Sequence, residues 1–208
     1  MKGRPPVAVE VLICGSPDRA DDGAPIAASE LLLGSLPPDV AMRVVGQLNV
    51  DDLLAIPPAA GVVIVDAATG IDPGAIVHLG LDGLIGRRGG IRPRSSHSLG
   101  LPEVVGLAEM IRGRPLRGRI VAIGAAEFGL GQPFSPPVAA ALPLLSDAVI
   151  EAVRQVRPRG PGFRPGNGPD GPRDGDFRVC PRAARRLMVD VAERTDGIND
   201  PARGQTDG

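Results

Sequence analysis

The sequence predicts an α/β fold, a three-layer αβα sandwich built on a mostly parallel sheet of about five strands. Short apolar runs rich in Val and Ile alternate with longer segments of helical periodicity along residues 1–157. These runs carry apolar residues on both faces, which is typical of parallel strands covered by helices on both sides. Hydrophobic residues make up 43% of the chain and aromatic residues only 2%, so we expect a core of Val, Leu, Ile and Ala.

The first strand–helix unit opens the chain. Residues 7–14 predict a buried strand, and Gly23 to Leu33 predict a helix that Gly34 ends. Asp22 stands where it would cap this helix, and Pro25 falls in the first turn, where proline is tolerated.

The middle of the chain adds three strands. Residues 41–48 predict a strand, followed by a short helix that Asn49 caps. Residues 61–67, GVVIVDA, are the clearest strand and end in Asp66. Residues 75–81 predict another strand, and since only a turn separates it from the strand before, this pair is expected to be antiparallel.

The last elements complete the sandwich. Residues 101–113 predict an amphipathic helix, and residues 119–125 a further strand. Residues 135–156 predict a long helix with Ser135 as its cap, in which Pro143 is able to introduce a kink.

The composition changes after this helix. Residues 1–157 form the predicted α/β domain, whereas residues 158–208 are rich in Pro, Gly and Arg and predict a largely disordered tail. Within the tail, residues 182–195 have the pattern of a short basic amphipathic helix.

Bulk properties and missing motifs exclude several functions. A net charge of −1 gives no attraction to nucleic acid or to an acidic membrane. The two cysteines lie far apart, so neither a disulfide framework nor a cysteine zinc site is expected. No apolar stretch of about 20 residues predicts a membrane helix, and without a signal segment the expected compartment is the cytoplasm. Nucleotide-binding glycine motifs are absent, and no serine lies in a nucleophile elbow.

Three side chains are candidates for chemistry: Asp22 after the first strand, Asp66 at the end of the third, and His97 before a helix. Sites in open α/β sheets form beyond the carboxyl ends of the strands, where these residues are expected. Two carboxylates and an imidazole suit a divalent transition ion such as nickel or zinc, and three ligands leave coordination positions open. Each residue also has a structural alternative: a helix cap for Asp22, a turn for Asp66, and a cap or backbone-bonded loop residue for His97.

The remaining polar candidates are interpreted as structural. His78 lies in the middle of a predicted strand, and Cys14 lies in a buried one. Asp51 and Asp52 open a helix and need no other role.

Four motifs in order resemble the hydrogenase maturation proteases, endopeptidases that trim the C-terminal tail of the large subunit of nickel–iron hydrogenases. The motifs are ICGSPDRADDG at residues 13–23, VVIVDAATG at 62–70, SSHSLGLPEVV at 95–105 and GLGQPFSPPVAAALP at 129–143. The sequence departs from the first motif at Ile13, where the family has glycine, at Ser16, where it has asparagine, and at Pro25, where it has glycine.

The resemblance implies a phosphorylase/hydrolase-like sandwich and an endopeptidase in which Asp22, Asp66 and His97 are both the catalytic and the metal-binding residues. Nickel would arrive with the substrate, no organic cofactor would be needed, and a monomer would act on the large-subunit precursor. The metal would polarise the peptide carbonyl or activate water with Asp22 or Asp66 as the base, or it would serve only in recognition. Two alternatives remain: a non-catalytic accessory protein that binds a metal or a hydrogenase subunit, and an unrelated metal-dependent hydrolase on a similar sandwich.

Overall fold

The computed structural model describes residues 6–85 and 100–158. His97 and residues 159–208 of the predicted tail lie outside these ranges, so the division into a domain and a tail stays a prediction.

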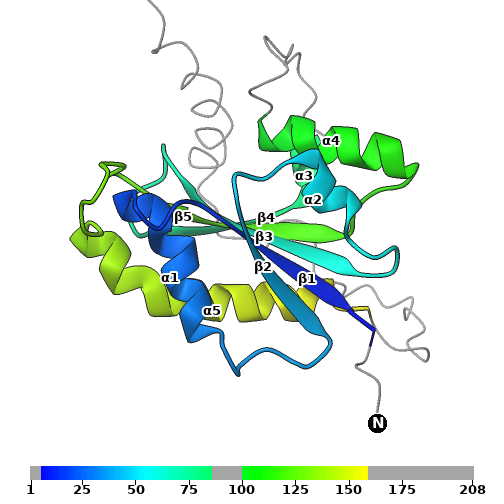
Figure 1. Ribbon diagram of the computed structural model, residues 1–208, viewed down its shortest axis with the longest axis horizontal. Coiled ribbons are helices and arrows are strands. Elements are labelled where there is room, and N and C mark those ends of the chain that lie inside the picture. The colour runs from blue at the N-terminus through cyan, green and yellow to red at the C-terminus, as the bar shows by residue number, and fades with distance from the viewer. Residues whose placement is uncertain (1–5, 86–99, 159–208) are drawn as a thin grey trace, which may run out of the picture.

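A five-stranded sheet organises the described chain, with the strand order β2-β1-β3-β5-β4 (Figure 1). Neighbouring strands are parallel across β2, β1, β3 and β5, and only β4 is antiparallel to its neighbour. The predicted fold class is therefore confirmed. The strands are β1 (Val9–Cys14), β2 (Val40–Gly46), β3 (Gly61–Ala68), β4 (Ile76–Gly80) and β5 (Gly118–Gly124).

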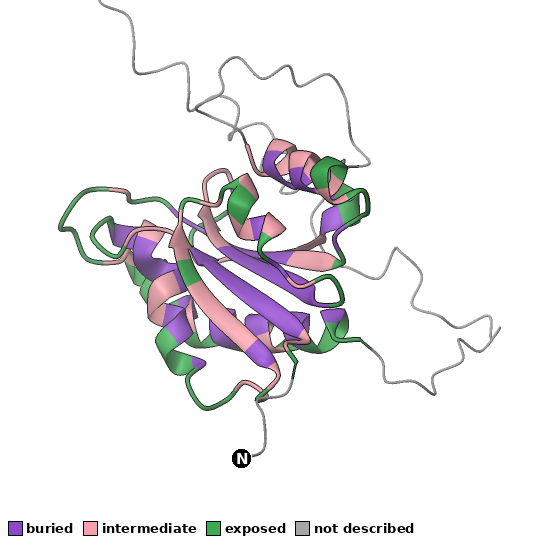
Figure 2. Ribbon diagram, turned by 45° about the vertical axis from the view of Figure 1, so that its right-hand side comes forward, coloured by how far each residue is buried: buried purple, intermediate pink, exposed green. Residues whose placement is uncertain are grey.

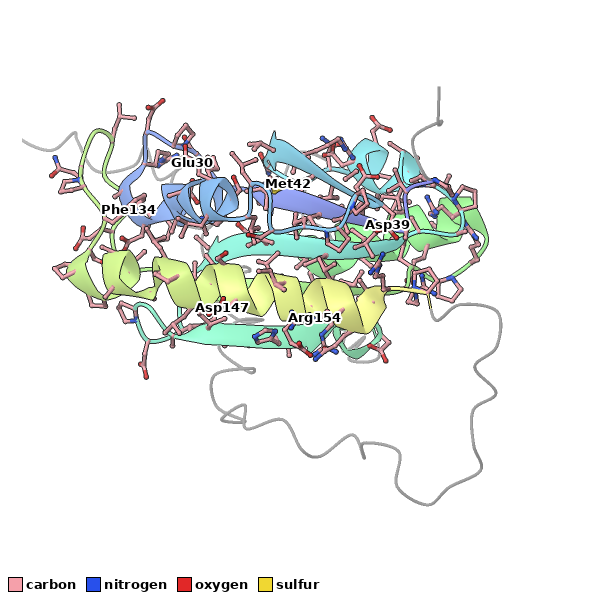
Figure 3. The ribbon with its side chains drawn as sticks, turned by 90° about the horizontal axis from the view of Figure 1, so that it is seen from below. Glu30, Asp39, Met42, Phe134, Asp147 and Arg154 are labelled. Atoms are coloured by element: carbon pink, nitrogen blue, oxygen red, sulfur yellow. The ribbon has the colours of Figure 1, made fainter. Side chains whose placement is uncertain are left out.

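Helices cover both faces of the sheet and make it the middle of three layers (Figure 1). One face carries α1 (Ala24–Leu31) and α5 (Pro136–Val156), which lie side by side in contact with each other (Figure 3). The other carries α2 (Val50–Leu54), α3 (Leu81–Ile85) and α4 (Leu101–Arg112). A short 3-10 helix, η1 (Ala20–Gly23), stands between β1 and α1.

The central strands are buried on both faces, as Figure 2 shows by colour. In β1, Val9, Val11 and Ile13 pack toward α1 and α5, whereas Leu12 and Cys14 pack toward α2, α3 and α4. This two-sided burial explains why the strands read as continuous apolar runs.

The strand β4 pairs with β5, not with the strand that precedes it in the sequence. The open side of β3 is occupied by β5, which pairs with it from Val62 to Ala68. The chain between β3 and β4 passes the end of β5 and is fixed there, since Gly124 donates a hydrogen bond to the carbonyl of Ala75 and its own carbonyl accepts one from Gly74. The antiparallel direction was predicted, but the neighbour was not, because a short connection does not require hydrogen bonding between the strands it joins.

One helix in the described part of the chain, α5, is long and apolar enough to cross a membrane by length and composition, contrary to the sequence expectation. Leu145 and Val149 on its inner side are fully buried against the sheet. A helix in the core of a folded domain can have this same length and apolar composition. Pro143 lies inside α5, and the helix continues on both sides of it.

Candidate functional site

The topology places a switch point at the carboxyl ends of β1 and β3. After β1 the chain goes through α1 to β2 on one side, and after β3 it goes to β4 and β5 on the other. Ligands of open α/β sheets bind at such a switch point. Asp22 follows β1 and Asp66 belongs to β3, so the topology brings both predicted carboxylates to this edge.

The loop after β1 is closed tightly over Gly15. This residue has a φ of +110°, and a Cβ atom there would lie 2.0 Å from the main-chain oxygen of Asp22. Only glycine accommodates both the conformation and the close approach. The next residue, Ser16, donates its amide hydrogen to Oδ2 of Asp22 at 3.0 Å. The loop therefore holds the Asp22 carboxylate by one of its two oxygens.

Asp22 is not the cap of α1, so that expectation is wrong. The N-cap of α1 is Gly23, without a side-chain hydrogen bond, because residues 20–23 wind into η1 and turn the Asp22 side chain back to Ser16. Within the described ranges, Oδ1 of Asp22 accepts no hydrogen bond, and the side chain is half-buried. One oxygen is thus fixed and the other is available to a ligand.

The neighbouring acid, Asp21, has a different environment. It is fully buried and accepts hydrogen bonds from the amides of Ala126, Glu127 and Ser135 and from the Ser135 hydroxyl, at 2.7–3.0 Å. Burial by itself raises the pKa of Asp21, but these donors stabilise the charged form more strongly and bring its pKa below the ordinary value. The paired acids therefore have different environments: Asp21 is a fully buried anchor, whereas Asp22 is half-buried after β1 at the carboxyl edge of the sheet.

Asp66 lies inside β3, two residues before its end, and does not start a turn. Its Oδ1 accepts the amide hydrogen of Ala67 at 2.9 Å. By strand alternation Asp66 shares the face of Val62 and Ile64, which pack toward α2 and α4. Cys14 at the end of β1 lies on this same face.

Three carboxylates contribute to the charge environment of the Cys14 thiol. Burial raises its pKa strongly, and the negative charges of Asp66, Asp52 and Asp22 raise it further, in that order. Because Coulomb energy falls with distance, all three carboxylates lie close enough to act on one buried sulfur. The expectation of an inert, packed thiol agrees with its 2% exposure.

His97 falls outside the described residues, so its place in the site stays a prediction. The chain is described again from Gly100, the N-cap of α4, three residues later. The helix α4 leads by a short connection into the start of β5, so its N-terminal end points back to the carboxyl edge of the sheet (Figure 1). It packs on the face that carries Asp66.

No three His, Cys, Asp or Glu side chains within residues 6–85 and 100–158 gather closely enough to hold a metal ion. The metal-binding role of Asp22, Asp66 and His97 therefore stays a prediction. His78 does not belong to this set. Burial lowers the pKa of His78, the Arg119 charge lowers it further, and the Glu151 charge opposes both. The charged groups that act on His78 are therefore Arg119 and Glu151, and not Asp22 or Asp66.

Sequence reasoning missed three contributions. Ser16 binds Asp22 through its amide, which no residue pattern signals. Ser135 occupies the N-cap position of α5 as predicted, but it makes no side-chain cap bond because its hydroxyl donates to Asp21. Asp52 forms a capping box with Asn49, which confirms that cap, and it also pairs with Arg43, an interaction that was not expected.

Comparison with known proteins identifies the fold. No family model and no curated protein matches the sequence. Among solved structures, the hydrogenase maturating endopeptidase HybD from E. coli is similar with a TM-score of 0.59 and 20% identity, over 72% of this chain and 93% of its own. The [NiFe] hydrogenase maturation protease HybD from Thermococcus kodakarensis has a TM-score of 0.55 and 23% identity, over 70% and 98%. The [NiFe] hydrogenase maturation protease HycI from Thermococcus kodakarensis has a TM-score of 0.55 and 22% identity, over 71% and 93%. This chain therefore has the fold of the hydrogenase maturation proteases, the family that its sequence motifs resemble.

Proposed function

We propose that this protein is an endopeptidase that removes the C-terminal extension of a nickel–iron hydrogenase large subunit after nickel insertion. Its partner is the precursor of that subunit, its compartment is the cytoplasm, and it acts as a monomer without an organic cofactor. Nickel is carried by the substrate and is recognised by Asp22, Asp66 and His97.

One observation carries the proposal. In a fold shared with hydrogenase maturation endopeptidases, Asp22 follows β1 and Asp66 lies in β3, so both carboxylates stand at the switch point of the sheet, and the charge of each raises the pKa of the buried Cys14 thiol. Asp22 has one oxygen fixed by Ser16 and the other without a partner among the described residues. A half-satisfied carboxylate at this position is suited to complete the coordination of an ion that arrives with another molecule.

This arrangement explains how processing waits for nickel. A precursor without nickel offers these ligands nothing to bind, so it loses the interaction that positions the scissile bond. Bound in this way, the substrate's own ion is able to polarise the peptide carbonyl or lower the pKa of a water molecule, with Asp22 or Asp66 as the base. If the ion serves only in recognition, the same three ligands are required for binding but not for the chemical step.

The test is the mass of the large subunit. Purified protein is incubated with the nickel-loaded and the nickel-free precursor from the same genome, and each subunit is followed by intact mass spectrometry. We expect loss of the C-terminal extension only from the nickel-loaded precursor. Asp22→Asn, Asp66→Asn and His97→Ala should each abolish the loss. Asp51→Asn, which removes an exposed carboxylate from α2, should process normally.

Two results would overturn the proposal. Processing by all three site variants would remove the assigned residues from the mechanism. A precursor that binds the protein but keeps its mass with nickel present would replace the peptidase by the accessory protein that the sequence left open.

A further inference from the structure

We propose that Asp21 is a positioning residue that fastens the loop after β1 to the loop between β5 and α5 and thereby fixes the Asp22 carboxylate. The role of Asp22 in this inference rests on the proposed function. Asp21 lies within the first motif, but neither the motifs nor the comparisons give it a role.

The contacts of Asp21 span both ends of the loop between β5 and α5. Oδ2 accepts the amides of Ala126 and Glu127, both at 3.0 Å, directly after β5. It also accepts the Ser135 hydroxyl at 2.9 Å, and Oδ1 accepts the Ser135 amide at 2.7 Å, where α5 begins. The Asp21 amide donates in return to the Glu127 carbonyl at 3.0 Å. One buried side chain thus joins the exit of β5, the start of α5 and η1.

The chemistry of this position requires a carboxylate. All four hydrogen-bonding groups around the side chain are donors, and an ionised carboxylate is the acceptor-only side chain that satisfies them. In an Asp21→Asn variant the amide group would turn its own hydrogens toward the Ser135 N–H. The buried donors would then lose a partner that water cannot replace, since Asp21 is fully buried.

The anchor is coupled to Asp22 through a strained segment of main chain. Ala20, immediately before Asp21, has a φ of +42°, in the left-handed region that residues with a Cβ atom rarely adopt. Such a conformation persists only where surrounding contacts impose it. Asp22 follows Asp21 directly and is bound on its other side by Ser16. Releasing Asp21 therefore removes one of the two restraints between which the Asp22 carboxylate is held.

A purely structural role would lower stability without moving Asp22, so the test needs a local signal. The Ser16 amide supplies one, because it donates to Asp22 and its 1H–15N chemical shift depends on that hydrogen bond. The variants are Asp21→Asn and Ser135→Ala, which removes one donor to Asp21. The matched control is Ser29→Ala, which removes a hydroxyl bond from the 6% exposed Ser29 to the Ile26 carbonyl in α1.

We expect the Ser16 amide resonance to shift in Asp21→Asn and Ser135→Ala and to stay in place in Ser29→Ala. Calorimetric titration with Ni2+ alone should show a roughly 10-fold loss of affinity in Ser135→Ala, a typical effect of removing support from a metal ligand, and none in Ser29→Ala. If Asp21→Asn does not fold, Ser135→Ala still carries the test.

An unchanged Ser16 resonance in Ser135→Ala, or an equal change in Ser29→Ala, would overturn the positioning role. The proposed function fails separately. Wild-type protein that neither binds Ni2+ nor processes the precursor would remove the function, while the Ser16 resonance would still decide whether Asp21 positions Asp22.

Discussion

The buried Asp21 carboxylate gives the sharpest quantitative prediction, through the substitution Asp21→Asn. The variant keeps the size of the side chain but loses the charge that four donors share. Three charge-assisted hydrogen bonds become neutral at about 1 kcal/mol each, and the Ser135 amide is left facing another donor at a further 1 kcal/mol or so, about 4 kcal/mol in all. A native domain has roughly 5–15 kcal/mol of stability, so we expect the variant to fold at neutral pH with its melting temperature lowered by roughly 10 °C.

The pH dependence follows from the direction of the pKa shift. Because hydrogen bonding outweighs burial and places the folded-state pKa of Asp21 below its unfolded value, the charge stabilises the protein above the unfolded pKa. This contribution is lost as the pH falls through the folded-state pKa. Asp39, whose pKa is lowered by Arg157, titrates alike in both proteins and cancels from the comparison. The difference in unfolding free energy between wild type and Asp21→Asn should therefore be largest near neutral pH and narrow below about pH 4.

Guanidinium unfolding of the metal-free proteins, followed by circular dichroism at several pH values, measures this difference. Far-ultraviolet circular dichroism is the suitable signal because the chain has no tryptophan or tyrosine. A difference below about 1 kcal/mol at neutral pH, or one that stays constant down to pH 3, would refute the account of Asp21 as an ionised anchor.

Three further predictions concern the loop, the thiol and the long helix. Gly15→Ala should lower the free energy of unfolding by about 3 kcal/mol or more, because backbone strain at a positive φ adds to the collision of the new Cβ with the Asp22 carbonyl. Thermal unfolding measures the loss, and an unchanged melting temperature would contradict the loop geometry. Cys14 should be alkylated slowly at pH 8 and faster in Asp66→Asn, because the Asp66 charge is the second cause, after burial, of the raised pKa of the thiol. Peptide mass spectrometry measures the two rates, and equal rates would show that the Asp66 charge does not act on the Cys14 thiol. Leu145→Ala should cost about 2–5 kcal/mol in guanidinium unfolding if α5 is a core helix, and a neutral result would argue against that packing.

The architecture was predictable because its signals are local. Two-sided apolar runs marked the strands, Asn49 marked the start of α2 through its capping box, and Gly113 marked the end of α4 with a φ of +68°. Each of these features depends on residues close together in the sequence, so composition and spacing are sufficient to find them.

The hydrogen bonds of the candidate site were not predictable for the opposite reason. Asp21 is 105–114 positions away from its donors, and nothing in either segment identifies the other. Asp22 and Ser135 were both assigned as helix caps, since their residue types suit that position, but tertiary contacts took their side chains elsewhere. The sequence pointed to Asp22 and Asp66, whose role as a site stays a prediction, whereas the different environments of Asp21 and Asp22 became visible only in the fold.

The central claim is that Asp22, Asp66 and His97 converge on one ion, and the histidine signals of a proton NMR spectrum test it directly. The chain contains only His78 and His97, so each imidazole is resolved and His78 serves as an internal control. Substoichiometric Ni2+ is predicted to broaden the His97 ring signals and leave those of His78 sharp, and Asp22→Asn and Asp66→Asn should each abolish the broadening. Equal effects on both histidines, or His97 broadening that persists in both variants, would contradict the account.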